Sequence, residues 1–285
     1  MAQSELQAQR FENKYIVDNA TALATRDFVR AYLELDEFSE SSPDLSYPVH
    51  SLYLDSPDLK LYRSTLNGDK NRYKLRIRYY DDDPDSPTFF EIKGRSNNTI
   101  SKQRGMVRRD ALGTLLAGHL PEESHMLSQR SSGLNTVRRF CWMVNELGAY
   151  PVAHVAYLRE AWVSPNDNSV RVTLDRQVLC DLDPTTNIFV GMTRPICVFG
   201  KQVVLELKFT NRFPDWFGDL VRIFNLVQCG AAKYAEGIIG LGVDRVMEEA
   251  HRVHGGLQTP GFRDPAILLS KGRSPFRMGS DLFND

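Results

Sequence analysis

The fold of this chain is decided by RYKLRIRY, residues 72–79, in which cations alternate with large apolar side chains. A β-strand sends alternate side chains to opposite faces, so one face of this strand carries Arg72, Lys74, Arg76 and Arg78. Cations about 7 Å apart repel one another unless something strongly anionic lies along them. A half-exposed strand with a solvated basic face is the simpler alternative, because antiparallel sheets often expose a polar face.

The same alternation recurs in segments that lie far apart in the sequence. Each has one apolar face and one face of Lys or Arg with a few acidic residues: 10–16, 89–93, 100–108, 155–163, 170–175 and 203–209. A sheet closed on itself explains this pattern if the charged faces point inward, and closure also removes exposed edges. We therefore predict an α+β fold, a closed antiparallel β-tunnel of about eight strands with a charged interior and helices packed outside.

Composition excludes several classes of protein. Hydrophobic content of 42% and charged content of 25% are ordinary for a globular protein. No apolar run reaches the roughly 18 residues of a membrane span, and residues 1–9 lack the apolar core of a signal peptide. The four cysteines are widely spaced and predict neither a zinc site nor disulfides. With a net charge of −1, we expect a cytoplasmic protein with no nucleic-acid partner and no direct membrane insertion.

The chain shows no internal repeat and no linker that would divide it. We predict an N-terminal extension over residues 1–9, one domain over residues 10–254, and a flexible or wrapping tail over residues 255–285 that is rich in Gly, Pro and Arg. Apolar residues at helical spacing predict helices over 21–35, 57–66, 112–120, 133–147, 214–227 and 235–253. Residues 39–48 and the acidic run 81–85 are predicted to be loops. Gly237, Gly240 and Gly242 are expected at close-packing positions or helix breaks.

Familiar active-site motifs are missing from the sequence. It has no Walker A loop, no G-x-S-x-G elbow and no H-E-x-x-H, and its six histidines are scattered. What remains is a cavity lined by Lys and Arg with two or three carboxylates, and this chemistry suits a polyphosphate chain. Cations neutralise phosphoryl oxygens, a carboxylate holds a divalent metal, and transfer needs mainly positioning and charge stabilisation.

Several short motifs, taken in order, resemble the VTC domain, the polyphosphate polymerase domain of the vacuolar transporter chaperone complex. They are R-x-E-x-K-Y at 10–15, SLYLDSPDL at 51–59, LRIRY at 75–79, FEIK at 90–93, LELKF at 205–209 and AKY at 232–234. The resemblance extends over about residues 10–246 and implies the CYTH, or triphosphate tunnel metalloenzyme, superfamily. It implies transfer of the γ-phosphoryl group of ATP to phosphate or a growing polyphosphate chain, with Mn²⁺ or Mg²⁺.

The resemblance also implies roles for matching residues. Lys14 would contact the reacting phosphates, Glu206 and Glu12 would hold the metal, and Lys233 would close one rim. Lys14, Arg76, Arg78 and Glu206 form the implied catalytic set. The phosphate-binding set adds Lys93, Lys102, Arg104, Arg159, Arg171, Lys208 and Lys233. ATP and inorganic polyphosphate or pyrophosphate are the implied partners, and an unidentified protein partner is left open.

Two departures from the family pattern bear on the reaction. Arg10 stands where the superfamily carries a glutamate, and Ala232 replaces a serine. Fewer carboxylates favour polymerase-like or binding behaviour over hydrolysis. The alternatives are tripolyphosphate or nucleoside-triphosphate hydrolysis on the same tunnel, a non-catalytic polyphosphate-binding module, or a structural lattice of salt bridges. Arg10, Arg72, Lys74 and Arg108 are expected to be structural or peripheral.

Overall fold

A ten-stranded antiparallel sheet dominates the computed structural model, which describes residues 10–97, 99–128, 131–165 and 169–254. The strand order is β1-β10-β8-β7-β3-β4-β5-β6, with β2 paired to β7 and β9 paired to β8. The strands are β1 (Arg10–Val17), β2 (Glu34–Leu35), β3 (Tyr47–Asp55), β4 (Asn71–Tyr79), β5 (Thr88–Ser96), β6 (Thr99–Val107), β7 (Tyr150–Val163), β8 (Val170–Leu182), β9 (Ile196–Cys197) and β10 (Val203–Thr210).

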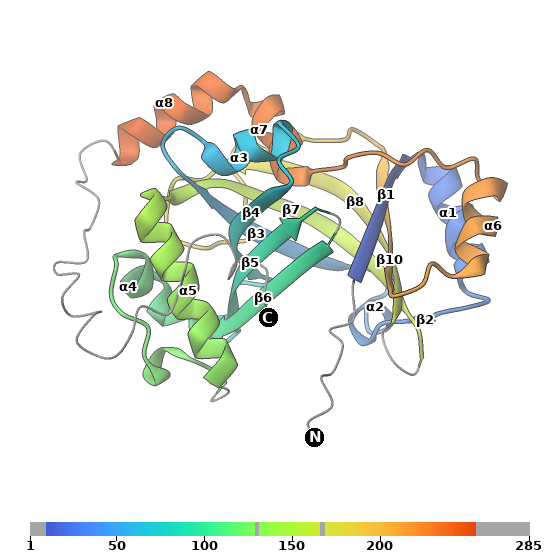
Figure 1. Cartoon of the computed structure of the whole chain (residues 1–285), viewed down its shortest axis with the longest axis horizontal. Coiled ribbons are helices and arrows are strands. Elements are labelled where there is room, and N and C mark those ends of the chain that lie inside the picture. Colours follow the sequence, from blue (N-terminus) through green and yellow to red (C-terminus); the bar gives the residue numbers. More distant parts are fainter. Residues whose placement is uncertain (1–9, 98, 129–130, 166–168, 255–285) are drawn as a thin grey trace.

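The helices gather in groups around this sheet (Figure 1). Those of four residues or more are α1 (Asn19–Val29), α2 (Glu37–Glu40), α3 (Lys60–Leu66), α4 (Leu112–Leu116), α5 (Ser131–Leu147), α6 (Asp215–Ile223), α7 (Lys233–Leu241) and α8 (Val243–His254). Helices α4 and α5 lie beside β5 and β6, whereas α1 and α6 lie together beside β1 and β10. Helices α3, α7 and α8 run along a third side. None of the described helices has the length and apolarity needed to cross a membrane.

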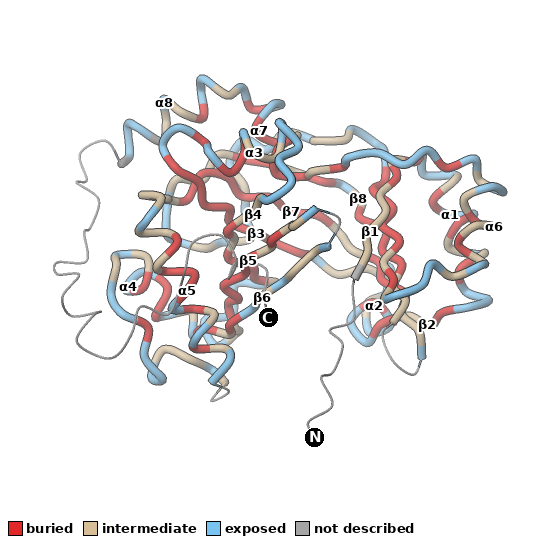
Figure 2. The backbone as a smooth tube through the Cα atoms, in the orientation of Figure 1, coloured by how far each residue is buried: buried red, intermediate tan, exposed pale blue. Residues whose placement is uncertain are grey.

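The apolar faces of the strands are buried under these helices. Leu75 and Ile77 of β4 lie in one core cluster with Phe140 of α5, and Leu207 of β10 lies in another with Phe217 of α6. All five side chains are fully buried. Figure 2 shows the same distribution, with buried strands at the centre and exposed helix surfaces outside. Burial of alternate strand positions thus leaves the opposite face of each strand for its charged residues.

The predicted α+β antiparallel fold is confirmed, but the described strands do not close into a hydrogen-bonded tunnel. β1 and β6, the two ends of the strand path, approach each other without pairing. Instead, Lys93 Nζ of β5 lies 3.1 Å from Glu12 Oε2 of β1. Charged side chains rather than a backbone ladder therefore connect the two ends of the sheet. Residues 1–9 and 255–285, predicted as extension and tail, lie outside the described residues.

Several helix boundaries differ from the sequence prediction. The first helix ends at Val29 rather than at residue 35, and Leu35 instead belongs to β2, opposite Trp162. The helix predicted over 57–66 begins at Lys60, after Leu59 in the left-handed region (φ 53°). The helices predicted over 112–120 and 214–227 are shorter, α4 and α6, and residues 37–40, placed at the edge of a predicted loop, form α2.

The long C-terminal helix predicted over 235–253 is two helices. Gly242 has φ 87°, a backbone conformation that glycine adopts without steric cost, and it separates α7 from α8. Gly237 faces β8, where an added Cβ would lie 2.5 Å from Cys180 Sγ. A Cβ on Gly240 would meet Ile196 of β9. The prediction that these glycines mark close packing or a break is therefore confirmed.

Candidate functional site

Side chains from seven strands and one helix meet on a single surface, here called the charged face. Its members are Glu12, Lys14, Lys74, Arg76, Arg78, Glu91, Lys93, Lys102, Arg104, Arg159, Thr173, Asp175, Glu206, Lys208 and Lys233. Cations outnumber carboxylates in this set. The face therefore combines the inward positions predicted from strand periodicity with Lys233 from the first turn of α7.

The first cluster on the charged face surrounds Glu91, whose side chain is fully buried. Strand register produces it, because Glu91 lies opposite Arg76 of β4 and opposite Arg104 of β6. Arg76 Nε donates to Glu91 Oε2 at 2.7 Å, and Lys102 Nζ lies 2.8 Å from Oε1. Arg104 and Arg78 complete the cluster at 3.3 and 3.9 Å. One carboxylate thus holds four cations together.

The second cluster surrounds Glu206 of β10. Lys208, Lys233 and Lys14 place their Nζ atoms 2.6, 3.0 and 3.3 Å from its carboxylate oxygens. Arg159 Nη2 lies 3.5 Å from Glu206 Oε2. Every predicted member of this group is therefore brought to one carboxylate, although the residues come from β1, β7, β10 and α7.

Asp175 of β8 fixes Arg159 and Lys233 beside this cluster. Arg159 donates to both of its carboxylate oxygens at 2.7 Å, and Lys233 Nζ lies 2.6 Å away. A bulge opposite Tyr157, where Gln177 has φ 51°, then shifts the phase of β8. Beyond it, Cys180 packs into the apolar cluster around α7. The bulge therefore marks the boundary between the charged part of this face and the part that α7 covers.

Glu12 of β1 lies between the two clusters. Its carboxylate oxygens lie 3.2 Å from Lys14 Nζ and 3.1 Å from Lys93 Nζ. Glu12 Oε1 is buried and makes no hydrogen bond of good geometry within the described residues. Lys14 therefore forms ion pairs with both predicted metal-binding carboxylates, Glu12 and Glu206.

Burial and neighbouring charges shift the titration of these groups in opposite directions. Burial raises the pKa of Glu206 and of Glu91, but the surrounding cations outweigh it and hold both values well below 4.5. Burial lowers the pKa of Lys102 to about 7, although the charge of Glu91 acts to raise it. Burial likewise lowers the pKa of Lys208 to about 8, although the charge of Glu206 acts to raise it. Both carboxylates are therefore ionised at neutral pH, whereas these two lysines titrate near it.

The charged face offers carboxylate ligands for a divalent metal, but too few among the described residues to coordinate it without further ligands. Among the described residues, no three His, Cys, Asp or Glu side chains gather in a way that could hold a metal ion. Mg²⁺ usually binds through one or two carboxylates plus substrate phosphates. Glu206 and Glu12, which Lys14 joins by ion pairs of 3.3 and 3.2 Å, fit that kind of site.

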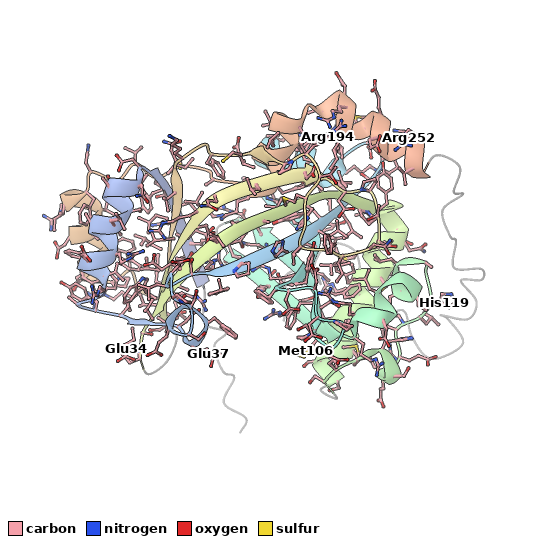
Figure 3. The ribbon with its side chains drawn as sticks, turned by 180° about the vertical axis from the view of Figure 1, so that it is seen from behind. Glu34, Glu37, Met106, His119, Arg194 and Arg252 are labelled. Atoms are coloured by element: carbon pink, nitrogen blue, oxygen red, sulfur yellow. The ribbon has the colours of Figure 1, made fainter. Side chains whose placement is uncertain are left out.

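One end of the charged face is rich in aromatic residues. The Arg104 guanidinium lies 3.4 Å from the centre of the Phe89 ring, and its Nη2 donates to the Tyr80 hydroxyl at 3.3 Å. Arg171, predicted inside the tunnel, pairs here with Asp36 at 2.7 Å and not with the central carboxylates. Figure 3, seen from behind, labels Glu37 of α2 and Met106 of β6 along one edge of the molecule. Arg171 therefore belongs to a rim rather than to either cluster.

Three functional candidates were not singled out by the sequence analysis. Asp175 pairs with Arg159 and Lys233. It lies on the same strand face as Arg171, and this alternation was the signal in the sequence that could have identified it. Tyr157 accepts a hydrogen bond from Arg78 at 3.1 Å, and Tyr53 accepts one from Arg76 at 3.1 Å. Tyr157 shares a strand face with Arg159, and that alternation was the available signal for it. Tyr53 lies on a strand without alternating charges, so periodicity gave no reason to count it.

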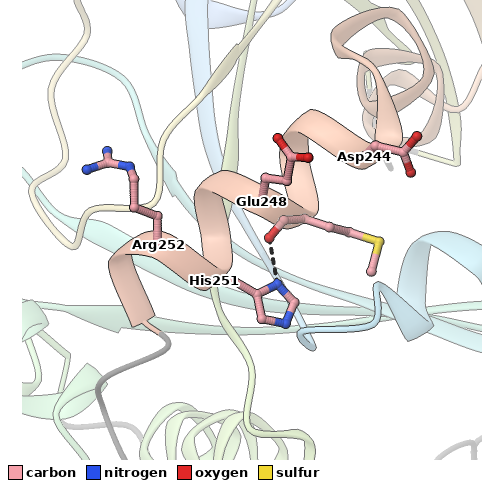
Figure 4. A pocket seen from close by; sticks show the side chains of 5 residues that line it. Asp244, Glu248, His251 and Arg252 are labelled. Atoms are coloured by element: carbon pink, nitrogen blue, oxygen red, sulfur yellow. Dashed lines mark hydrogen bonds between the residues drawn. The ribbon is translucent and has the colours of Figure 1, made fainter.

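A separate hollow of about 640 Å³ lies on α8 (Figure 4). Its lining consists of Asp244, Met247, Glu248, His251 and Arg252. His251 Nδ1 lies 2.7 Å from the Met247 carbonyl oxygen within the same helix. No residue of the charged face lines this hollow, so it is distinct from the candidate site.

The fold and the charged face together define an α+β protein built around the cation-rich face of an antiparallel sheet. This chain belongs to the VTC domain family, which matches residues 9–241. The family resemblance noted in the sequence motifs is therefore confirmed.

The comparisons with known proteins include one curated relative, vacuolar transporter chaperone complex subunit 2 of Schizosaccharomyces pombe. It is 26% identical over 131 residues, and the match covers 44% of this chain and 18% of that protein. Similar solved structures include a candidate adenylate cyclase from Bacillus halodurans, with 12% identity, 78% of this chain and 93% of that chain covered, and a TM-score of 0.43. PH1819 from Pyrococcus horikoshii OT3 has 13% identity, coverage of 82% and 99%, and a TM-score of 0.42. At these TM-scores neither structure supports an argument about function.

Proposed function

We propose that this protein is a metal-dependent polyphosphate polymerase that transfers the γ-phosphoryl group of ATP to a growing polyphosphate chain. The observation that carries the proposal is the excess of cations over buried carboxylates on the charged face. A linear polyphosphate supplies the missing negative charge along its whole length. Membership of the VTC domain family and the similarity to a vacuolar transporter chaperone subunit support polyphosphate as the substrate.

In the proposed reaction, a terminal oxygen of the acceptor chain forms a bond to the γ phosphorus. The bond from the γ phosphorus to the β–γ bridging oxygen breaks, and ADP leaves. Phosphoryl transfer of this kind needs positioning and neutralisation of charge more than covalent help from the protein. We assign Lys14 to the reacting phosphates because it lies between Glu12 and Glu206, and assign Arg76 and Arg78 to neutralising them.

Glu206 and Glu12 would hold Mn²⁺ or Mg²⁺ together with nucleotide phosphates, and the metal would neutralise charge on those phosphates. Binding of this kind requires Lys14, Lys208 and Lys233 to release the carboxylate and turn toward the phosphates. Lysine side chains are flexible enough to do so. Lys93, Lys102, Arg104, Arg159 and Arg171 would line the path of the chain.

We further propose that the charged face encloses its substrate as a tunnel. The ion pair between Lys93 and Glu12 already links β5 to β1 at 3.1 Å. An anionic chain lying between these edges would draw further cations from both sides. A cytoplasmic location also belongs to this proposal, since the four cysteines are free thiols.

A non-catalytic polyphosphate-binding module is the second candidate. Its support is the ion-pair lattice itself, in which Lys208 and Lys233 occupy the Glu206 carboxylate at 2.6 and 3.0 Å. A carboxylate that only orders cations needs no metal. Such a module would bind the polymer and act with a partner subunit, as the similarity to a subunit of a complex suggests.

Product analysis separates these functions. Purified protein is incubated with ATP and Mn²⁺, and polymer and free phosphate are both followed over time. Polymer that disappears in Lys14→Ala and Glu206→Gln, but persists in the matched control Glu249→Gln on α8, supports the polymerase. Free phosphate without polymer would move the assignment to hydrolysis. Tight polyphosphate binding without either product would support the binding module.

A further inference from the structure

The row of cations on β4 continues past the Glu91 cluster toward the start of the strand. Arg76 and Arg78 contact Glu91, whereas Lys74 and Arg72, the next two residues on the same face, form no ion pair with a carboxylate of the described residues. Among the described residues, Arg95 of β5 and Lys70 also form no ion pair. These four residues, Lys70, Arg72, Lys74 and Arg95, are here called the basic track.

Strand register places like charges of the basic track directly opposite each other. Arg72 lies across from Arg95, and Lys74 lies across from Lys93. Like charges at directly opposed positions destabilise a sheet. Arg95 Nε donates only to the Asn97 carbonyl oxygen at 2.8 Å, and Arg72 donates to the Asp69 carbonyl. Carbonyl oxygens satisfy the donors but do not neutralise the charge, and Asp69 offsets the repulsion at Arg72 only in part.

The electrostatics of Lys74 agree with this geometry. Burial, followed by the charges of Lys14 and Lys93, lowers its pKa to about 7. Burial and then Arg95 likewise lower the pKa of Arg72, and the nearby charge of Asp69 offsets this only in part. Buried cations that lie this close together without a carboxylate between them are stabilised when an anionic ligand binds. We therefore expect the basic track to bind an anion.

A hollow lies at the outer end of the basic track. Its volume is about 410 Å³, and its lining residues are Gly68, Lys70, Arg72, Arg95 and Asn97. It adjoins the start of β4 and the end of β5, at the opposite end of these strands from Tyr80 and Phe89. None of its lining residues in the described part of the chain is aromatic. Sites for single-stranded nucleic acids combine a basic groove with aromatic rings on which bases stack, so a basic lining without such rings suits a polyanion without bases.

We propose that the basic track binds phosphates of a linear polyphosphate beyond those held at the Glu91 and Glu206 clusters. The inference rests on the proposed function, because it places the same polymer on the same face. Alternate strand residues recur about every 7 Å, and guanidinium groups donate in a geometry that matches phosphate oxygens. A triphosphate would fill the central clusters only, so the track gives preference to long chains.

The test compares two anions on the full chain, inorganic tripolyphosphate and a long-chain polyphosphate, by isothermal titration calorimetry at several salt concentrations. The variant is Arg72→Gln/Arg95→Gln, and the matched control is Arg108→Gln/Arg222→Gln, which removes two exposed arginines elsewhere. We expect the affinity for long-chain polyphosphate to fall at least tenfold in the variant only. Affinity for tripolyphosphate should stay within twofold, and the salt slope for the long chain should become shallower by about 2.

Thermal unfolding of the free variant checks its folding, and we expect no loss of stability, because the change removes two opposed like charges. Equal losses for both anions, or no loss for the long chain, would overturn the inference while leaving the proposed function intact. An equal loss of affinity for single-stranded RNA would overturn the assignment of the track to polyphosphate. Wild-type protein that binds neither phosphate compound would instead refute the proposed function.

Discussion

Replacing Glu91 by glutamine gives the most direct test of how the charged face is held together. Glu91 is fully buried and contacts Arg76, Arg78, Lys102 and Arg104. Removing one partner of a buried ion pair typically costs about 3–5 kcal/mol. The side chains of Lys102 and Arg104 are 44% and 36% exposed, so solvent relieves part of the repulsion. We therefore expect Glu91→Gln to lower the free energy of unfolding by about 3 kcal/mol.

The loss should appear as a decrease in Tm and should be reversed by anions. For a chain of this size, about 3 kcal/mol corresponds to a decrease of about 6–12 °C. Tripolyphosphate replaces the missing negative charge, so it should bind the variant more tightly than the wild type. A tenfold gain in affinity would add about 1.4 kcal/mol of stabilisation at saturating ligand. The assay is differential scanning fluorimetry at constant ionic strength, with and without tripolyphosphate.

Glu249→Gln on α8 is the matched control, since its carboxylate pairs with the exposed Arg252 outside the charged face. We expect its Tm to match the wild type within about 2 °C, because surface ion pairs contribute about 0–1 kcal/mol. A Glu91→Gln Tm equal to that of the control would show that Glu91 does not hold these cations together. A smaller rise in Tm with tripolyphosphate for the variant than for the wild type would show that the anion does not replace the charge of Glu91.

Lys74 and Gly237 give the remaining predictions. The pKa of Lys74 is about 7 in the folded protein, against 10.5 for an ordinary lysine. Binding of polyphosphate should raise this pKa, so Lys74 should take up a proton when the polymer binds. Affinity should therefore fall as pH rises above about 7, and calorimetry in two buffers of different ionisation enthalpy should show the uptake, which Lys74→Met abolishes. By the same shift, the free protein should gain stability between pH 7 and 10.5, where the unfolded chain binds more protons. Gly237→Ala should cost about 1–3 kcal/mol in urea unfolding, because its Cβ would meet Cys180 Sγ at 2.5 Å. Gly218→Ala in α6, which has nothing within 4 Å, should be neutral or stabilising; equal losses in both variants would contradict the packing argument.

Much of the charged face was predictable because strand periodicity is local. Arg76 and Arg78 share a face whatever the strand pairs with, and so do Glu206 and Lys208. The antiparallel α+β class follows from the same alternation. Lys233 entered through the family resemblance alone, since nothing in its local sequence indicates that α7 carries it to Glu206 at 3.0 Å.

Pairing between distant segments was not predictable in the same way. The position of Glu91 between Arg76 and Arg104 depends on the register of β4, β5 and β6, which the sequence pattern leaves open. The bulge opposite Tyr157 changes which residues of β8 reach the charged face. The end of α1 at Val29 also depended on tertiary context, because apolar spacing continued past it, whereas Gly242 marked a candidate break in the sequence itself.

The amino-acid sequence alone specifies which face of each strand is charged, which helices cover the apolar faces, and which types of residue are available to bind phosphate. The pairing of each cation with its carboxylate comes from the three-dimensional arrangement. So do the link between Lys93 and Glu12 in place of backbone pairing at the ends of the sheet and the position of Arg171 at a rim with Asp36. Side-chain alternation is fixed by covalent geometry within one strand. Ion pairing falls off over a few ångströms, so it depends on how separate strands come to lie together.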